Sequence, residues 1–167
     1  YKDALSAVGN KGITKKYPHT PGIDAAGIVI SSKDGKFKEG DEVIVTGFDL
    51  GVNTSGGFGQ FIRVPAGWLI KLPNGISLKE SMIYGTAGFT AALSLYQLEH
   101  LGLEPSDDEI LVTGATGGVG SVAVSLLNRV GFKVVAATGK MHKSDYLKKL
   151  GARFVLSREE VDDLSGK

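Results

Sequence analysis

The sequence has 167 residues, of which 42% are hydrophobic and 22% charged, and its formal net charge is +1. Because the charges nearly balance, composition predicts no strongly basic surface, and we expect neither nucleic acid nor a membrane as a partner. No apolar run approaches the roughly 20 residues that a membrane-spanning helix needs. Cysteine is absent, which excludes disulfides, thiolate ligands to zinc and a cysteine nucleophile in this chain, and is consistent with a cytoplasmic protein.

The first 76 residues predict a small β-barrel or sandwich. Four short runs are rich in Val, Ile and aromatic residues, as β-strands are. They lie at 25–31, 42–46, 60–64 and 68–72. Turn-forming residues, mostly Gly, Asp and Asn, separate the runs. We therefore interpret residues 1–76 as a β-rich domain.

The hydrophobic period becomes helical after Gly75. Ser77 and Glu80 have the spacing of a capping box, in which each side chain accepts a hydrogen bond from the backbone of the other residue. A second helix is predicted from Ala87 to Leu101, and Gly102 would end it. These helices would link the β-rich domain to the remainder of the chain.

The remainder alternates strands with helices. Apolar strands are predicted at 109–113, 133–138 and 153–156, and amphipathic helices at 119–130 and 144–150. A β-α-β-α-β order implies right-handed crossovers and a parallel sheet. We therefore predict an α/β fold in which residues 77–167 contain the linking helices and the first half of a dinucleotide-binding domain.

A glycine-rich segment, 114–120, lies between the first of these strands and the helix after it. In this position glycines let backbone N–H groups approach a pyrophosphate, and the helix N-terminus adds partial positive charge. We expect a valine in place of Gly117 to fill that space and to resist a positive φ. The alternative is a tight strand–helix turn that binds nothing.

The second strand of this unit ends with Ala137-Thr138-Gly139-Lys140, and no carboxylate lies nearby in the sequence. NAD-binding proteins usually carry an acidic residue here for the ribose hydroxyls. A small hydroxyl with nearby lysines, Lys140 and Lys143, favours the 2′-phosphate of NADPH instead. In the alternative interpretation both lysines are solvated surface charges.

Five segments carry a family resemblance: YKDAL at 1–5, PHTPGIDAAGIV at 18–29, GDEV at 40–43, GTAGFTA at 85–91 and TGATGGVG at 113–120. Together they resemble the medium-chain dehydrogenase/reductase superfamily, in its quinone oxidoreductase branch and nearest to the acrylyl-CoA reductase subgroup. The resemblance implies a GroES-like β-barrel domain followed by a partial Rossmann dinucleotide-binding domain. It also implies that the chain is incomplete at both ends, so we expect residues 1–167 alone to expose a sheet edge and to aggregate.

The same resemblance indicates a protein without zinc. Zinc-dependent relatives place a histidine and a glutamate where this sequence has Ile23 and Asp24. The three histidines are scattered, do not form the ligand set that a catalytic zinc needs, and are interpreted as surface or structural residues. They are His19, His100 and His142. We interpret Asp24 as a turn or cap carboxylate, with an acid catalyst as the alternative.

Members of this branch transfer a hydride from NADPH to an activated C=C bond. The resemblance therefore implies a reductase of a small molecule, either a quinone or an α,β-unsaturated carbonyl compound such as acrylyl-CoA, and a homodimer when the protein is full length. It places Tyr1 beside the nicotinamide, as catalytic residue and cofactor contact, with Thr90 near it. The implied pyrophosphate contacts are Thr116, Gly117, Gly118 and Val119, and the implied 2′-phosphate contacts are Thr138, Gly139 and Lys140.

Three further alternatives remain open at this point. Tyr1 has a second interpretation as an aromatic residue at a strand end, packed on the barrel. The protein as a whole has a second enzymatic interpretation, a 2-enoyl thioester reductase of fatty-acid metabolism. It also has a non-enzymatic one, a sensor that binds NADPH on the same fold without turnover.

Overall fold

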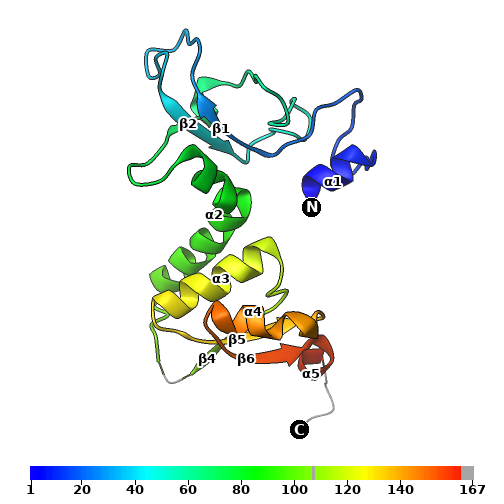
Figure 1. Cartoon of the computed structure of the whole chain (residues 1–167), viewed down its shortest axis with the longest axis vertical. Coiled ribbons are helices and arrows are strands. Elements are labelled where there is room, and N and C mark those ends of the chain that lie inside the picture. The colour runs from blue at the N-terminus through cyan, green and yellow to red at the C-terminus, as the bar shows by residue number, and fades with distance from the viewer. Residues whose placement is uncertain (107, 163–167) are drawn as a thin grey trace. The chain divides into compact units, whose positions relative to one another are not determined.

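The computed structural model describes residues 1–106 and 108–162. The chain forms two compact units, Tyr1–Thr86 and Ala87–Lys167, which we call unit 1 and unit 2. Their residues can be followed by colour in Figure 1, from blue to green for unit 1 and from green to red for unit 2. The division falls inside helix α2 (Leu78–His100). The sequence predicts the boundary at residue 76, before this helix begins.

Unit 1 contains a three-stranded antiparallel sheet in the order β1-β2-β3. Its elements are α1 (Lys2–Ala7), β1 (Asp24–Ile28), β2 (Glu42–Thr46), the 3-10 helix η1 (Ala66–Trp68) and β3 (Ile70–Lys71). The strand predicted at 42–46 is confirmed, and those predicted at 25–31 and 68–72 are present in shorter form, as β1 and β3. The connections between these strands are long, at 29–41 and 47–69, so strand propensity and not a hairpin turn located them.

The prediction of a strand at 60–64 is wrong. These residues form no strand, and Phe61 and Ile62 are exposed. Residues of high β propensity form a strand only where a neighbouring strand supplies hydrogen bonds, and no strand in the described residues does so here. The short helix α1 was not predicted, because six residues are too few to display a helical period.

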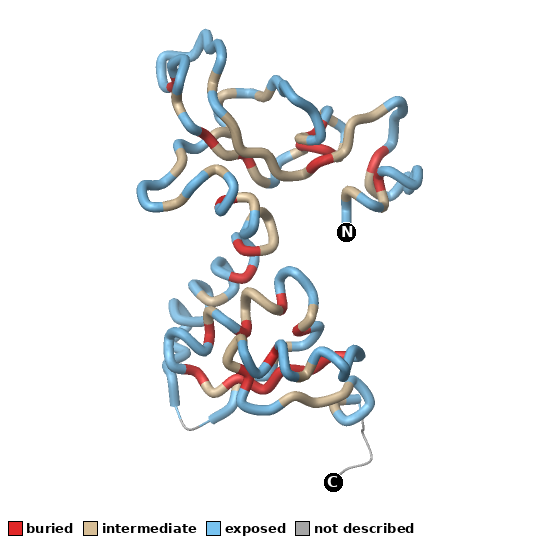
Figure 2. Tube along the Cα trace, viewed as in Figure 1, coloured by how far each residue is buried: buried red, intermediate tan, exposed pale blue. Residues whose placement is uncertain are grey.

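The core of unit 1 is small. Val43 and Val45 of β2 are buried on one face of the strand, and Phe37 and Leu50 in the loops before and after β2 are also buried. Most other large apolar side chains of this unit, such as Ile28 at 59% exposed, remain accessible. Figure 2 shows the resulting pattern, in which exposed and half-buried residues dominate the trace of unit 1.

Helix α2 begins with the predicted capping box. The N–H of Ser77 donates to the Glu80 carboxylate at 2.9 Å, and the N–H of Glu80 donates to the Ser77 hydroxyl oxygen at 3.2 Å. The helix is interrupted at Gly85, whose backbone is not helical, and the part after it is the predicted second helix. Gly102, with a φ of 87°, follows its end. No helix in the described residues, including this long one, has the length and apolar character that crossing a membrane requires.

Unit 2 contains a parallel sheet in the order β4-β5-β6. After α2 its elements are β4 (Glu109–Val112), α3 (Gly118–Arg129), β5 (Lys133–Thr138), the 3-10 helix η2 (Met141–Lys143), α4 (Ser144–Lys149), β6 (Ala152–Ser157) and α5 (Arg158–Asp162). Helices α3 and α4 cover the same face of the sheet (Figure 1). The predicted β-α-β-α-β order and the α/β fold class are confirmed.

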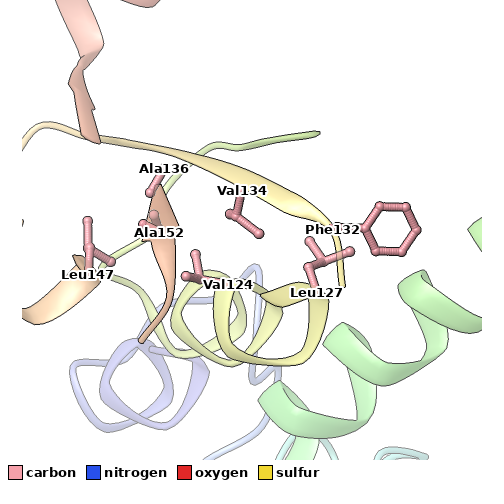
Figure 3. Packing of buried hydrophobic residues seen from close by; sticks show 8 residues of the cluster. Val124, Leu127, Phe132, Val134, Ala136, Leu147 and Ala152 are labelled. Carbon is pink, nitrogen blue, oxygen red and sulfur yellow. The ribbon is translucent and has the colours of Figure 1, made fainter. Parts of the chain in front are cut away.

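The core of unit 2 lies between this sheet and the helices on it. Val124 and Leu127 of α3 point toward Val134 of β5, and Leu147 of α4 joins the same cluster (Figure 3). Leu127 belongs to the apolar stripe that predicted the helix, whereas Val124 is a buried residue that the predicted stripe did not include. Strand β5 has a neighbour on both edges, which is why five of its six residues are buried.

Candidate cofactor-binding site

The glycine-rich segment forms the loop between β4 and α3. Gly114 has a positive φ of 58°, and the N–H of Gly117 donates to its carbonyl oxygen at 2.8 Å, which closes a tight turn. Gly117 is the N-cap residue of α3, and no side chain caps the helix. The first N–H groups of this 12-residue helix can therefore serve an anion, which the helix dipole also favours. The loop has the geometry that a pyrophosphate site needs.

The structure corrects part of the argument about Gly117. Its φ is −79°, so no positive φ has to be avoided there. The residue with that requirement is Gly114. A Cβ on Gly117 would lie 3.2 Å from the Gly114 carbonyl oxygen, whereas a Cβ on Gly120 would overlap that oxygen. Gly120 is therefore the glycine that lets α3 pack closely on the turn, as one glycine of a dinucleotide-binding loop must.

The N-terminal end of α3 lies close to α2. A Cβ on Gly118 would lie 3.3 Å from the Cβ of Ala87. Thr90 follows Ala87 by about one turn of α2 and is exposed. The residues predicted to contact the pyrophosphate and Thr90 are thus all in unit 2.

The end of β5 is tied to the glycine loop by two threonines. The hydroxyl oxygens of Thr116 and Thr138 are 3.0 Å apart, and the N–H of Lys140 donates to the Thr138 oxygen at 3.0 Å. Thr138 is only 3% exposed. Its hydroxyl therefore joins the loop to the strand end, while the side chain of Lys140 is exposed beyond it.

Sequence reasoning missed Arg158, the first residue of α5. Its guanidinium lies 3.9 Å from the position of a Cβ on Gly139, so a second cation accompanies Lys140 at the end of β5. The helix start is held by a capping box, in which the N–H of Ser157 donates to Glu160 at 2.7 Å. The hydrogen bonds from the backbone and then the hydroxyl of Ser157 lower the pKa of the Glu160 carboxyl. The Ser-x-x-Glu spacing was the sequence signal that could have located this helix.

Tyr1 lies in unit 1, apart in sequence and in unit from the other predicted site residues. It is the N-cap residue of α1 and is 94% exposed, so its interpretation as a strand-end aromatic packed on the barrel is wrong. Helix α1, which follows Tyr1, is anchored to the segment just before β1. Asp3 accepts hydrogen bonds from the N–H groups of Gly22 and Ile23, both at 2.9 Å.

Asp24 is a cap carboxylate, as predicted. Its Oδ1 accepts hydrogen bonds from the backbone N–H of Thr86 at 2.9 Å and from the Thr86 hydroxyl at 2.7 Å. The hydrocarbon side chain of Ile23 has no atom that could ligate a metal. In the described residues no group of three or more His, Cys, Asp or Glu side chains is placed to hold a metal ion. The half-buried His19 packs edge-on against Tyr17, with 6.3 Å between ring centroids.

Comparison with known proteins covers both units. Residues 1–74 match the alcohol dehydrogenase GroES-like domain family. The yhdH oxidoreductase from Salmonella enterica, solved in complex with NADP, superposes with a TM-score of 0.93 at 49% identity, over 96% of this chain and 49% of its own. The Bacillus subtilis protein YhfP, solved with NAD bound, superposes with a TM-score of 0.92 at 56% identity, over 98% of this chain and 50% of its own.

A GroES-like domain followed by a glycine loop on a parallel β-α-β-α-β sheet is the arrangement of the medium-chain dehydrogenase/reductase superfamily, to which both units of this chain are similar. The predicted resemblance is thereby confirmed. The chain is 46% identical, over 163 residues, to the acrylyl-CoA reductase AcuI of Ruegeria pomeroyi, which corresponds to 98% of this chain and 49% of that protein. YhfP, whose name assigns it to the quinone oxidoreductases, is 56% identical over 163 residues. The chain spans about half the length of these curated relatives.

Proposed function

We propose that the protein containing this chain is a zinc-independent oxidoreductase that transfers a hydride from NADPH to an activated C=C bond. The observation that carries the proposal is the glycine loop, whose uncapped helix end and close glycine packing suit a dinucleotide, with the cations Lys140 and Arg158 near the end of β5. NADPH would supply the hydride when bound. The chain's own residues hold and orient it.

The loop residues Thr116–Val119 would hold the pyrophosphate through backbone N–H groups. The exposed side chains of Lys140, which follows Gly139 in the chain, and of Arg158, which lies near Gly139, would hold the 2′-phosphate. A planar guanidinium and a flexible ammonium are both suited to phosphate oxygens. Tyr1 would meet the nicotinamide end, and α1 holds it on a turn that Asp3 anchors to the Gly22 backbone.

The substrate in this proposal is a small molecule with an activated C=C bond, either a quinone or an α,β-unsaturated thioester such as acrylyl-CoA. The similarity to proteins named for both substrates supports it. Zinc independence is part of the proposal, because Ile23 offers no ligand atom and the Asp24 carboxylate is engaged with Thr86. A homodimer in the cytoplasm is proposed with it, on the strength of the family resemblance.

Cofactor preference is the direct test, since the similar structures include one with NADP and one with NAD. We expect the full-length protein to bind NADPH more tightly than NADH in a fluorescence titration. A charge-assisted bond to phosphate is worth roughly 1.5–3 kcal/mol, so Lys140→Ala should weaken NADPH binding about tenfold or more and leave NADH binding unchanged. Lys148→Ala, on the exposed side of α4, is the control. Equal affinities for the two cofactors in the wild-type protein would contradict the proposal.

The reaction is tested by NADPH consumption with acrylyl-CoA, other enoyl-CoA esters and quinones. We expect turnover with at least one of these compounds. Preference for longer enoyl thioesters would favour the fatty-acid reductase. Tight NADPH binding without turnover of any compound would favour the sensor and exclude the enzyme.

A further inference from the structure

Asp24 connects the sheet of unit 1 to the kink of α2. It is the first residue of β1, where it pairs with Thr46 of β2, so its backbone is held by the sheet. Its Oδ1 accepts the two hydrogen bonds from Thr86, which lies 62 positions later in the chain. A contact between such distant residues fixes where the second part of α2 begins.

Gly85 provides the space for this contact. Its backbone has a φ of 49° and a ψ of −151°, a combination open essentially to glycine alone. A Cβ on Gly85 would lie 2.9 Å from Oδ2 of Asp24. The carboxylate therefore packs against Gly85 with one oxygen and holds Thr86 with the other. It acts as an N-cap supplied from a distant strand.

The helical part that begins at Thr86 carries residues of the candidate cofactor site. Ala87 lies beside Gly118 at the start of α3. Thr90, four positions after Thr86, lies on the same side of the helix as Thr86. A rotation or shift at Thr86 would therefore move the helix against the glycine loop and would move Thr90 with it.

We propose that Asp24 is a positioning residue for the cofactor, acting through Thr86 on the part of α2 that lies beside the glycine loop. The proposal rests on the proposed function, since it requires that this loop binds NADPH. Asp24 serves as a hydrogen-bond acceptor, because both of its bonds to Thr86 require an oxygen lone pair and neither requires a transferable proton.

The experiment compares variants of the full-length protein by NADPH titration, thermal melting and steady-state rate. Asp24→Ala removes both bonds and should raise the Kd for NADPH on the order of tenfold, and Thr86→Val removes one bond and should raise it about threefold. Asp24→Asn keeps an acceptor oxygen, and Thr86→Ser keeps the hydroxyl. Both should stay within about twofold of the wild type in Kd and kcat.

Ser77→Ala is the matched control, because it removes an N-cap from the first part of the same helix. It should lower the Tm as Asp24→Ala does and leave the Kd for NADPH unchanged. An Asp24→Asn variant with normal NADPH affinity and a kcat reduced far more than twofold would show that the carboxyl proton is used, and would overturn the positioning role. So would an Asp24→Ala variant that loses only Tm. A wild-type protein that binds no NADPH would overturn the proposed function and this inference together, whereas the other two outcomes leave the proposed function intact.

Discussion

The glycines of the loop between β4 and α3 have different surroundings, and the difference can be measured. A Cβ on Gly120 would overlap the carbonyl oxygen of Gly114 and lie 2.8 Å from the Cα of Ala115. Backbone atoms cannot move aside as a flexible side chain can. A Cβ on Gly117 meets the same oxygen at 3.2 Å, and the backbone conformation of Gly117 is open to any residue. Gly120 therefore supports the packing of α3 on the turn, whereas Gly117 lies at the helix end that the ligand would use.

We therefore expect Gly120→Ala to destabilise the full-length protein by about 1–3 kcal/mol, the usual cost of overpacking. Gly117→Val should retain more of the Tm and lose most of the NADPH affinity, because its side chain stands at the N-terminal end of α3. Thermal melting and NADPH titration of both variants test this. A folded Gly117→Val protein with normal NADPH affinity would mean that the loop is only a turn.

Helices α2 and α5 both begin with a capping box. The pairs Ser77–Glu80 and Ser157–Glu160 both form capping boxes, at the starts of α2 and α5. The hydrogen bonds that the Ser77 hydroxyl and then the Ser77 backbone donate lower the pKa of the Glu80 carboxyl. A lowered pKa in the folded state means that the ionised carboxylate stabilises the fold. This contribution is complete above the pKa of the unfolded chain, and is lost as the pH falls through the pKa of the folded one.

We expect Glu80→Gln to flatten the acid side of the stability profile. The wild-type Tm should fall as the pH is lowered through the carboxyl range, from about pH 6 to about pH 3, and the variant should lose less over that interval. Glu39→Gln, in the exposed turn before β2, is the control and should keep the wild-type slope. Identical slopes for Glu80→Gln and the wild type would show that the capping box does not contribute to the pH dependence.

At the scale of the whole chain, the apolar surface is unevenly covered. Unit 1 has an open groove of about 530 Å³ lined by β1, β2 and the segment from 57 to 64, and Phe61 and Ile28 at its walls are exposed. In the described part of unit 2, β4 pairs only with β5, and Leu111 on β4 is 47% exposed. An unpaired strand edge with an accessible apolar side chain is a template for association.

We therefore expect the 167 residues, produced by themselves, to associate as their concentration rises. Leu111→Lys places a charge on the open edge and should shift the sedimentation profile toward the monomer. Analytical ultracentrifugation of the two forms, with thermal melting, makes the comparison. A monomeric wild-type segment with a sharp, cooperative melt would show that these surfaces do not drive association.

What the sequence determined by itself is the local structure and the chemistry of single loops. The capping box at Ser77, the glycine loop and the alternation of unit 2 were all predictable, because each depends on residues within a few positions of one another. The absence of an acidic residue after β5 was visible for the same reason.

Only the tertiary structure decided which distant residues meet. Arg158 lies near Gly139 because β6 pairs with β5. Asp24 bonds to Thr86 because the interruption of α2 at Gly85 lies against the Asp24 carboxylate. The tertiary structure also left residues 60–64 without a strand partner, despite their β propensity. Contacts between distant residues depend on the path of the whole backbone, whereas propensity and spacing report only on neighbours in the chain.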